Sequence, residues 1–280
     1  MKIIKSDDIV ENVKLLCIEA NNQLPNDVKD ALYKAIDEED DELAKETLNV
    51  LKENALIASS AHSPICQDTG MACVFVEIGQ EVYVEGSLEE AINEGVRQGY
   101  EEGYLRKSVV NDPVFERINT KDNTPAIINY RIVSGDQLKI TVAPKGFGSE
   151  NMCQVKMLKP SDGVKGIKDF VLKVVEDAGP NACPPMVIGV GIGGSFDRVT
   201  LLSKIAMMRE IGTHNGDARY AQLEDELLDR INQLGIGPAG YGGKTTALSL
   251  NIETYPTHIA GMPVAVSICC HVARHKEVVL

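Results

Sequence analysis

Three cysteines stand in sequence contexts that are unusual for buried structural thiols. Cys66 lies in PICQDTG beside an amide, a carboxylate and a hydroxyl, Cys183 precedes two prolines in GPNACPPM, and Cys270 ends an apolar segment in SICCHVARH. Three thiolates suit an iron–sulfur cluster in which one iron has no protein ligand. Such an iron is an open Lewis acid that can bind a hydroxyl and a carboxylate and make hydroxide a better leaving group.

The spacing of these cysteines leaves a second interpretation open. They are far apart in the sequence, whereas zinc ribbons and ferredoxin-type clusters draw their ligands from close pairs, so each ligand here would come from a different loop. Spacing alone therefore favours three buried or incidental thiols. Cys269 competes with Cys270 for the third position, and the remaining cysteines are interpreted as core or incidental residues: Cys17, Cys73 and Cys153.

Residues suited to proton transfer and to binding an anion lie near the same motifs. Asp68 follows Cys66, and His258 carries the imidazole group that titrates nearest neutral pH. A dicarboxylate would also need cations, for which Arg106, Lys145 and Arg274 are candidates because the arginine fork suits a carboxylate. Taken singly, each of these cations is more typical of a surface or helix-end charge, and a lone histidine is more typical of a residue satisfied in the core.

The overall composition restricts the possible partners and the compartment. The chain has 280 residues and a formal net charge of −13, which argues against nucleic acid or an anionic membrane surface as a partner. No apolar run is long enough to cross a bilayer, and acidic residues interrupt the N-terminal segment where a signal peptide would be apolar. Seven irregularly spaced cysteines indicate free thiols or metal ligands, so we expect a cytoplasmic protein.

The hydrophobic pattern predicts an α+β fold, with a helical N-terminal section followed by a mixed α/β core, which would be the cluster-binding core if the three cysteines are ligands. Residues 1–57 form the mainly helical section of one domain that spans residues 1–280. Two strand-like segments, residues 126–133 and 138–144, flank a turn at Ser134–Gly135–Asp136, as in a hairpin. The other expected elements are strands at 71–77, 186–192, 247–253 and 263–270 and helices at 87–106, 166–177, 197–209 and 218–234.

Two glycine motifs suggest nucleotide binding instead. GVGIGG, Gly189 to Gly194, fits the dinucleotide fingerprint and would indicate a nucleotide-binding oxidoreductase, but the strand with an acidic end that should follow is missing. A glycine turn that packs a helix on a strand is the alternative. The second motif, GIGPAGYGGKTTA, resembles a phosphate-binding loop, but Pro238 stands where that loop needs glycine.

Five ordered motifs identify a family resemblance over residues 55 to 280. PICQDTG, KGFGSEN, NACPPMVIGVGIGG, LGIGPAGYGGKTTAL and the closing CHVARH resemble the α subunit of the two-subunit, iron–sulfur class I fumarate hydratases and of L-tartrate dehydratase. This resemblance implies that Cys66, Cys183 and Cys270 hold a [4Fe–4S] cluster with one open iron. It implies catalytic roles for Asp68 and His258, and contact with the dicarboxylate by Gln67, Asp68, Arg106, Gly148 and Arg274.

The resemblance also implies an activity and a partner. The family reaction is the reversible hydration of fumarate to L-malate, a step of the tricarboxylic acid cycle, and L-tartrate dehydratase is the alternative. Single-chain relatives carry a second domain that would begin where this sequence ends, at HKEVVL. A separate β subunit is therefore expected to complete the active site, with an α dimer in an α2β2 assembly. A non-catalytic assembly protein remains a third interpretation, which predicts a fold that is unaffected by chelators and binds no dicarboxylate.

Overall fold

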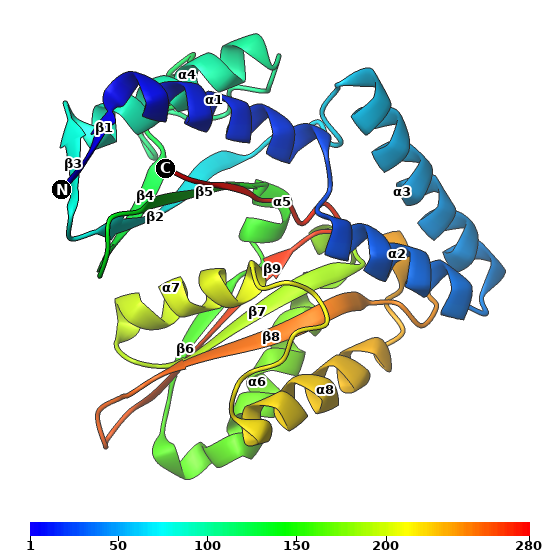
Figure 1. Ribbon diagram of the computed structural model, residues 1–280. Coiled ribbons are helices and arrows are strands. Elements are labelled where there is room, and N and C mark those ends of the chain that lie inside the picture. Colours follow the sequence, from blue (N-terminus) through cyan, green and yellow to red (C-terminus); the bar gives the residue numbers. More distant parts are fainter. The chain divides into compact units, whose positions relative to one another are not determined.

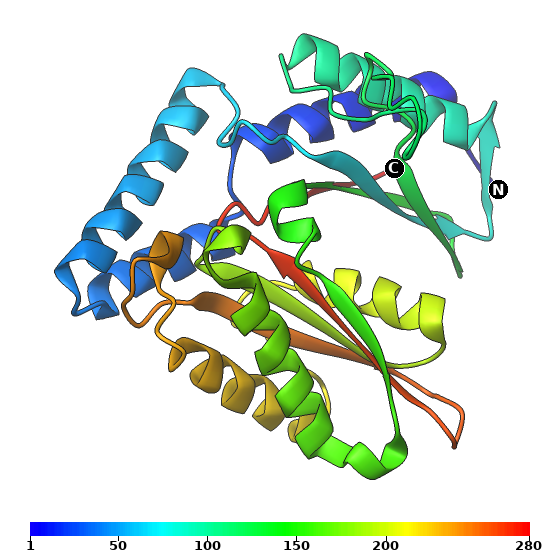
Figure 2. The same ribbon diagram turned by 180° about the vertical axis from the view of Figure 1, so that it is seen from behind.

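The computed structural model describes all residues from Met1 to Leu280. The chain packs into two compact units, and neither is continuous in sequence: unit 1 comprises Met1–Pro25, Asn54–Phe147 and Arg274–Leu280, and unit 2 comprises Asn26–Glu53 and Gly148–Ala273. Helices and strands are mixed throughout, as the sequence predicted (Figures 1 and 2). The predicted helical section is real but divided, because its first helix belongs to unit 1 and its second to unit 2.

Unit 1 consists of two helices over a four-stranded sheet, with a small two-stranded sheet beside them. Its helices are α1 (Ser6–Asn22) and α4 (Leu88–Glu102), and its strands are β1 (Lys2–Lys5), β2 (Met71–Gly79), β3 (Val82–Glu85), β4 (Ile127–Val133), β5 (Leu138–Lys145) and β10 (Lys276–Val279). The large sheet has the order β10-β5-β2-β4, and β1 pairs with β3 in parallel. Figure 1 shows α1 and α4 side by side. They approach closely because α4 has glycine at the contact: a Cβ on Gly95 would lie 2.7 Å from the Val10 carbonyl oxygen.

The expected hairpin between residues 126 and 144 is absent. Strand β2 lies between β4 and β5, pairing in parallel with β4 and antiparallel with β5. The turn after β4 instead crosses the end of β2, where the N–H group of Gly79 donates to the Gln137 carbonyl at 2.9 Å. One face of β2 packs into the core of unit 1, where Ala72, Val74 and Val76 are almost completely buried.

Unit 2 is a four-stranded sheet with helices on both faces. Its strands are β6 (Gln154–Leu158), β7 (Met186–Gly193), β8 (Ala247–Tyr255) and β9 (Met262–Cys269), in the order β6-β9-β7-β8. Its helices are α2 (Asn26–Glu38), the first part of α3 (Glu42–Ala61), α6 (Gly163–Ala178), α7 (Phe196–Met207) and α8 (Ala218–Asn232), with short 3-10 turns at Pro160–Asp162, Gly179–Ala182 and Pro238–Gly240. A single turn, α5 (Phe147–Glu150), spans the boundary between the units.

Alternation along β7 assigns one face of this sheet to each helical layer. Ile188 and Val190 belong to the apolar core that contains residues of α6 and α8. The intervening Gly189 and Gly191 face α7, and a Cβ on either would lie within 2.2 Å of a carbonyl oxygen of that helix. Figure 2 shows the two layers on opposite sides of the sheet.

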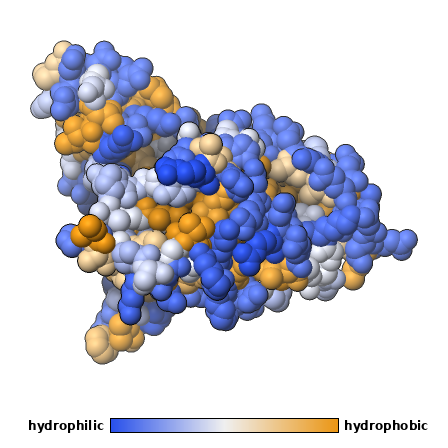
Figure 3. All heavy atoms as spheres, turned by 90° about the horizontal axis from the view of Figure 1, so that it is seen from below, coloured by the Kyte–Doolittle hydropathy of each residue, from blue (hydrophilic) through white to orange (hydrophobic).

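One face of the molecule is mostly polar (Figure 3). The face drawn in Figure 3 is mostly hydrophilic, with apolar atoms in patches that polar residues interrupt. None of the helices combines the length and the apolar composition that crossing a membrane would require.

Candidate active site

In unit 1, the loop Cys66–Gly70 joins α3 to β2 and is held by the segment that carries Arg106. The hydroxyl of buried Thr69 accepts the N–H group of Arg106 at 2.8 Å and donates to the Arg106 carbonyl oxygen at 3.1 Å. The Arg106 side chain is exposed. One side chain of the cysteine loop therefore fixes the backbone from which this cation extends.

The end of the same loop is fixed by two fully buried side chains. The Tyr100 hydroxyl lies 2.9 Å from the carbonyl oxygen of Thr69 and 3.0 Å from that of Gly70, and the Asn123 amide donates to the Gly70 carbonyl at 3.1 Å. Burial raises the pKa of Tyr100, so the phenol stays a donor. Gly70 has φ +73°, and a Cβ there would lie 2.5 Å from the Lys145 carbonyl carbon. Only glycine fits this position.

Asp68 is the most constrained polar residue of the loop. Its Oδ1 accepts the Gly70 N–H group at 2.9 Å, and its Oδ2 accepts the Phe147 N–H group at 2.7 Å. The Asp68 side chain is half-buried, and neighbouring Gln67 is exposed. The structure thus presents an oriented carboxylate beside Cys66, with the amide of Gln67 open to solvent.

Arg274, also in unit 1, is buried next to this loop. Its side chain donates through Nη2 to the Asp68 carbonyl oxygen at 2.6 Å, and the residue is only 6% exposed. Its Nε and Nη1 atoms are buried and have no hydrogen-bond partner. Burying an unpaired polar group costs about 1–3 kcal/mol, and more when it is charged. The guanidinium therefore has donors for an acceptor that the chain itself does not provide.

In unit 2, the structure brings Cys183 and Cys270 together. The carbonyl oxygen of Cys183 accepts the N–H group of His271, the residue after Cys270, at 3.2 Å, and lies 3.1 Å from His271 Nδ1. Strand pairing places them at the same end of the sheet, because Val187 of β7 pairs with Cys269 of β9. Cys183 is exposed and has φ 52°, a left-handed conformation that is strained for a residue with a side chain. Strain at an exposed thiol suggests a functional position.

The cysteines that were not predicted to be ligands differ from Cys183 and Cys270 in burial and in their contacts. Cys269 is 6% exposed and its thiol lies 3.9 Å from the Val272 carbonyl oxygen, whereas Cys270 is half-buried. The thiol of Cys153 accepts the N–H group of Ile268 at 3.2 Å. Cys17 is completely buried in unit 1, and burial raises the pKa of its thiol to about 12. Exposure thus favours Cys270 over Cys269.

Gly148 and His258 lie at opposite ends of unit 2. Exposed Gly148 is close to the Cys183 segment, since a Cβ there would lie 3.8 Å from the Asn181 carbonyl oxygen. His258 is exposed in the turn between β8 and β9, where Nδ1 accepts the Ala260 N–H group at 3.2 Å. Strand β9 extends from this turn toward Cys270 over eight residues, which span about 25 Å. The structure therefore does not bring His258 near Cys183 and Cys270 of its own unit. Figure 1 shows the turn between β8 and β9 at the far end of these two strands.

No group of three or more His, Cys, Asp or Glu side chains is arranged to hold a metal ion. Cys66 belongs to unit 1, whereas Cys183 and Cys270 belong to unit 2. Each unit by itself nevertheless has a feature that suits a bound inorganic group. In unit 2, two thiol residues share one sheet end and one of them is exposed and strained. In unit 1, the Cys66 loop has a buried cation with unused donors.

The GVGIGG motif serves packing. Gly189 and Gly191 lie within β7, and added Cβ atoms would come within 2.0 Å of the Ser203 carbonyl oxygen and 2.2 Å of the Val199 carbonyl oxygen, both in α7. The glycines let this helix lie directly on the strand. Packing of a helix on a strand is the alternative to dinucleotide binding that the sequence analysis gave for this motif. The oxidoreductase interpretation therefore loses the motif on which it depended.

The phosphate-loop resemblance also has a structural explanation. The buried Glu39 carboxylate accepts the N–H groups of Lys244 at 2.9 Å and Thr245 at 3.2 Å, and the Thr245 hydroxyl at 3.3 Å. The Lys244 ammonium pairs with Asp40. Donors that would bind a phosphate are therefore occupied by a carboxylate of the same unit.

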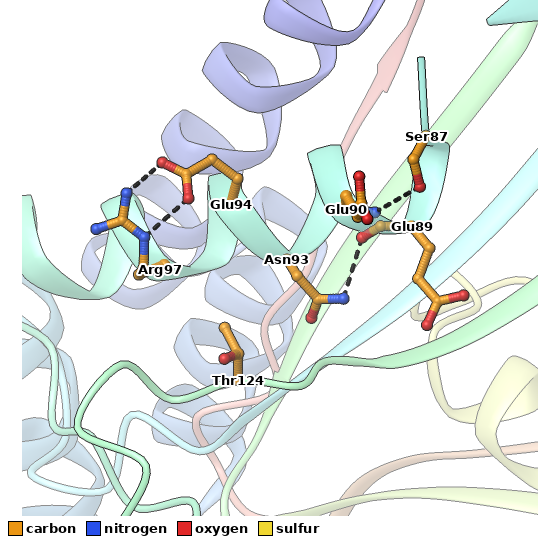
Figure 4. Close-up of a pocket in the computed structure, with 7 residues that line it drawn as sticks. All are labelled: Ser87, Glu89, Glu90, Asn93, Glu94, Arg97 and Thr124. Atoms are coloured by element: carbon orange, nitrogen blue, oxygen red, sulfur yellow. Dashed lines mark hydrogen bonds and ion pairs between the residues drawn. The ribbon is translucent and has the colours of Figure 1, made fainter.

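A polar pocket of about 440 Å³ lies on α4 of unit 1, but it contains none of the predicted site residues. Figure 4 shows the Arg97 guanidinium paired with Glu94 and the Asn93 amide donating to the Glu89 carbonyl. The Asn93 side-chain oxygen accepts the Ala126 N–H group at 2.8 Å. The one cation that lines this pocket, Arg97, is therefore already paired with a carboxylate.

Sequence reasoning missed the supporting residues of the Cys66 loop. Tyr100 and Asn123 lie about 30 and 50 positions from Gly70 in the sequence, in segments without any motif. Thr69 could have been found, because its hydroxyl lies within the quoted PICQDTG motif.

Comparison with known proteins gives consistent matches over nearly the whole chain. A model of the family described as fumarate hydratase (fumerase) matches residues 10–279. A protein of Methanocaldococcus jannaschii with the provisional name L(+)-tartrate dehydratase subunit alpha is 44% identical over 279 residues, which cover 98% of this chain and 96% of the relative. The L(+)-tartrate dehydratase subunit alpha of Escherichia coli strain UTI89 is 31% identical over 274 residues, covering 96% and 89%.

Proposed function

Because this chain belongs to the fumarate hydratase family of hydro-lyases, we propose that it is the cluster-bearing α subunit of an enzyme that reversibly hydrates fumarate to L-malate. The observation that supports this most directly is the contact between the Cys183 backbone and His271, the neighbour of Cys270, with Cys183 exposed and strained. Incidental thiols would be expected to follow the core pattern of Cys17 instead.

Cys66, Cys183 and Cys270 would hold a [4Fe–4S] cluster. When bound, this cofactor would supply an iron without a protein ligand, a Lewis acid that assists the departure of hydroxide. The buried Arg274 guanidinium lies next to the loop of Cys66 and has two donor atoms without a partner. These donors favour the binding of an anionic group in this region.

The chain's own polar residues would bind and orient the substrate. Arg106 is exposed on a backbone that Thr69 fixes, so its guanidinium is accessible to pair with a carboxylate. Gln67 and the exposed N–H group of Gly148 would add hydrogen bonds. Asp68, whose carboxylate is oriented by two backbone N–H groups, would hold or transfer the proton at the reacting carbon.

L-tartrate is the alternative substrate, and the names of the relatives favour it. Both reactions remove water from a hydroxylated dicarboxylate, so the same residues would serve either. Comparing kcat/KM for L-malate and L-tartrate on one preparation decides between them, because the ratio reports differential transition-state binding.

A separate β subunit would complete the site, since the relatives are named as α subunits. We place the assembly in the cytoplasm because the cysteine usage suits a reducing compartment. The α chain alone is expected to bind the cluster but to turn over substrate only when the β chain is present.

Iron analysis tests the proposed function. Anaerobically purified αβ complex is expected to contain about four iron and four sulfide per α chain. Exposure to air should remove activity, and iron with a reductant should restore it, because an iron without a protein ligand is readily lost. A complex that holds no iron even after reconstitution, or that keeps full activity in air, would contradict the proposal.

We further propose an α dimer within an α2β2 assembly, in which His258 acts on the site of the second copy. The support is the length of β9, which separates His258 from Cys270 of its own chain. Mixing two inactive variants, Cys183→Ala and His258→Ala, should restore about a quarter of the wild-type activity after subunit exchange, because half of the dimers are mixed and each has one intact site. Mixtures that stay inactive would show that His258 acts within its own chain or not at all.

A further inference from the structure

We infer that Arg274 supports the bound cluster and the loop that ligates it, instead of binding the substrate as the family resemblance suggests. This inference rests on the proposed function, because it needs the cluster to be present. It assigns one buried cation of this chain to the cofactor and leaves Arg106 as the substrate cation of unit 1.

Burial argues against direct substrate contact. Arg274 is 6% exposed, whereas Arg106 and Gln67 of the same unit are exposed. A dicarboxylate arriving from water meets Arg106 first, and reaching Arg274 would require the loop itself to move. The hydrogen bonds of Thr69, Tyr100 and Asn123 oppose such a movement.

The contacts of Arg274 tie it to the cysteine loop. Nη2 donates to the Asp68 carbonyl oxygen, two residues after Cys66, and Arg274 itself follows Cys270 by four residues. One side chain therefore connects the backbone after the first ligand with the segment that follows the third. Its loss should loosen the position of Cys66.

The unused donors of Arg274 indicate an acceptor that is itself buried and anionic. No carboxylate of the chain accepts a hydrogen bond from Nε or Nη1. The oxygens of nearby Asp68 accept the N–H groups of Gly70 and Phe147 instead. Two of the three proposed thiolate ligands lie within four residues of these contacts in sequence. A cluster with three thiolates carries negative charge, and hydrogen bonds and nearby charge set its reduction potential.

The positive charge of Arg274 also acts on a neighbouring residue of unit 1. Burial raises the pKa of Tyr100, and the positive charge of Arg274 opposes that effect. The guanidinium is thus close enough to influence a residue that holds the carbonyl groups of Thr69 and Gly70.

The experiment compares Arg274→Gln with Arg106→Gln in the αβ complex. Removing the Arg274 charge should shift the cluster potential, followed by spectroscopy in a redox titration, to a more negative value, because a nearby cation favours the more negative reduced state. It should also speed iron loss to a chelator, by about 10-fold or more, with a small change in KM. Arg106→Gln should instead raise KM and leave the potential and the rate of iron loss unchanged.

Arg274→Lys keeps the positive charge and covers the case in which the glutamine variant does not fold. It should retain a near wild-type potential and KM while losing iron faster. If either Arg274 variant raises KM as Arg106→Gln does and leaves the potential and iron loss unchanged, Arg274 is a substrate ligand and the inference is wrong. A wild-type complex without iron would instead contradict the proposed function itself.

Discussion

Replacing Cys183 by alanine is expected to abolish hydro-lyase activity and to reduce iron from about four atoms per chain to near zero. The thiol is exposed, so its removal leaves no cavity and the variant should fold like the wild type. Alanine can occupy the left-handed position about as well as cysteine, so backbone strain is unchanged. Iron content, activity and the circular dichroism spectrum, measured on one preparation, separate loss of a ligand from loss of the fold.

Cys269→Ala is the matched control, because Cys269 lies at the same end of the same sheet with its side chain buried. It should cost about 1–2 kcal/mol of unfolding free energy through lost packing, while iron and activity remain. Cys17→Ala and Cys153→Ala should likewise remain active. If Cys269→Ala loses iron and Cys183→Ala or Cys270→Ala keeps it, the proposed ligand set is wrong.

Much of the fold could be predicted from the sequence because its elements have strong local signals. Helix α8 and strand β7 follow from hydrophobic periodicity, and their observed bounds lie within a few residues of those expected. The insertion of β2 between β4 and β5 has no local signal. It depends on pairing between segments that are far apart in the sequence, and a turn sequence cannot reveal that.

The candidate site shows the same limit. The sequence contexts of the cysteines suggested the ligands. The choice between Cys269 and Cys270, however, depends on which of these two neighbouring side chains faces the core at the end of the strand. Glu39 occupies the phosphate-loop donors from about 200 positions away, so no motif could have indicated it. His258 was expected near the reacting centre from the family resemblance, and the predicted strand at 263–270 already separates it from Cys270 of its own chain. A single sequence does not show whether a second copy brings His258 to that centre.

Asp68→Asn is expected to lower kcat by about 10²–10⁴-fold, the range for loss of a positioned acid or base, while iron content stays at the wild-type level. The amide cannot accept both N–H groups that the carboxylate accepts, so either Gly70 or Phe147 loses its acceptor. The free energy of unfolding should therefore also fall, by about 1–3 kcal/mol. The kinetic effect would far exceed what this modest destabilisation explains at temperatures where the variant is folded.

A matched substitution distinguishes proton transfer from loop support, because Asp112 makes the same kind of contact in an exposed loop of unit 1. Its carboxylate accepts the N–H groups of Glu116, Val114 and Phe115, which hold the pKa of Asp112 below its ordinary value. Asp112→Asn removes the same charge and disturbs the same kind of turn, yet kcat should stay within about twofold of wild type. If Asp68→Asn behaves like Asp112→Asn and keeps its kcat, the Asp68 carboxylate only supports the loop. The proton must then be handled by another residue, from the β subunit or from a second copy of His258.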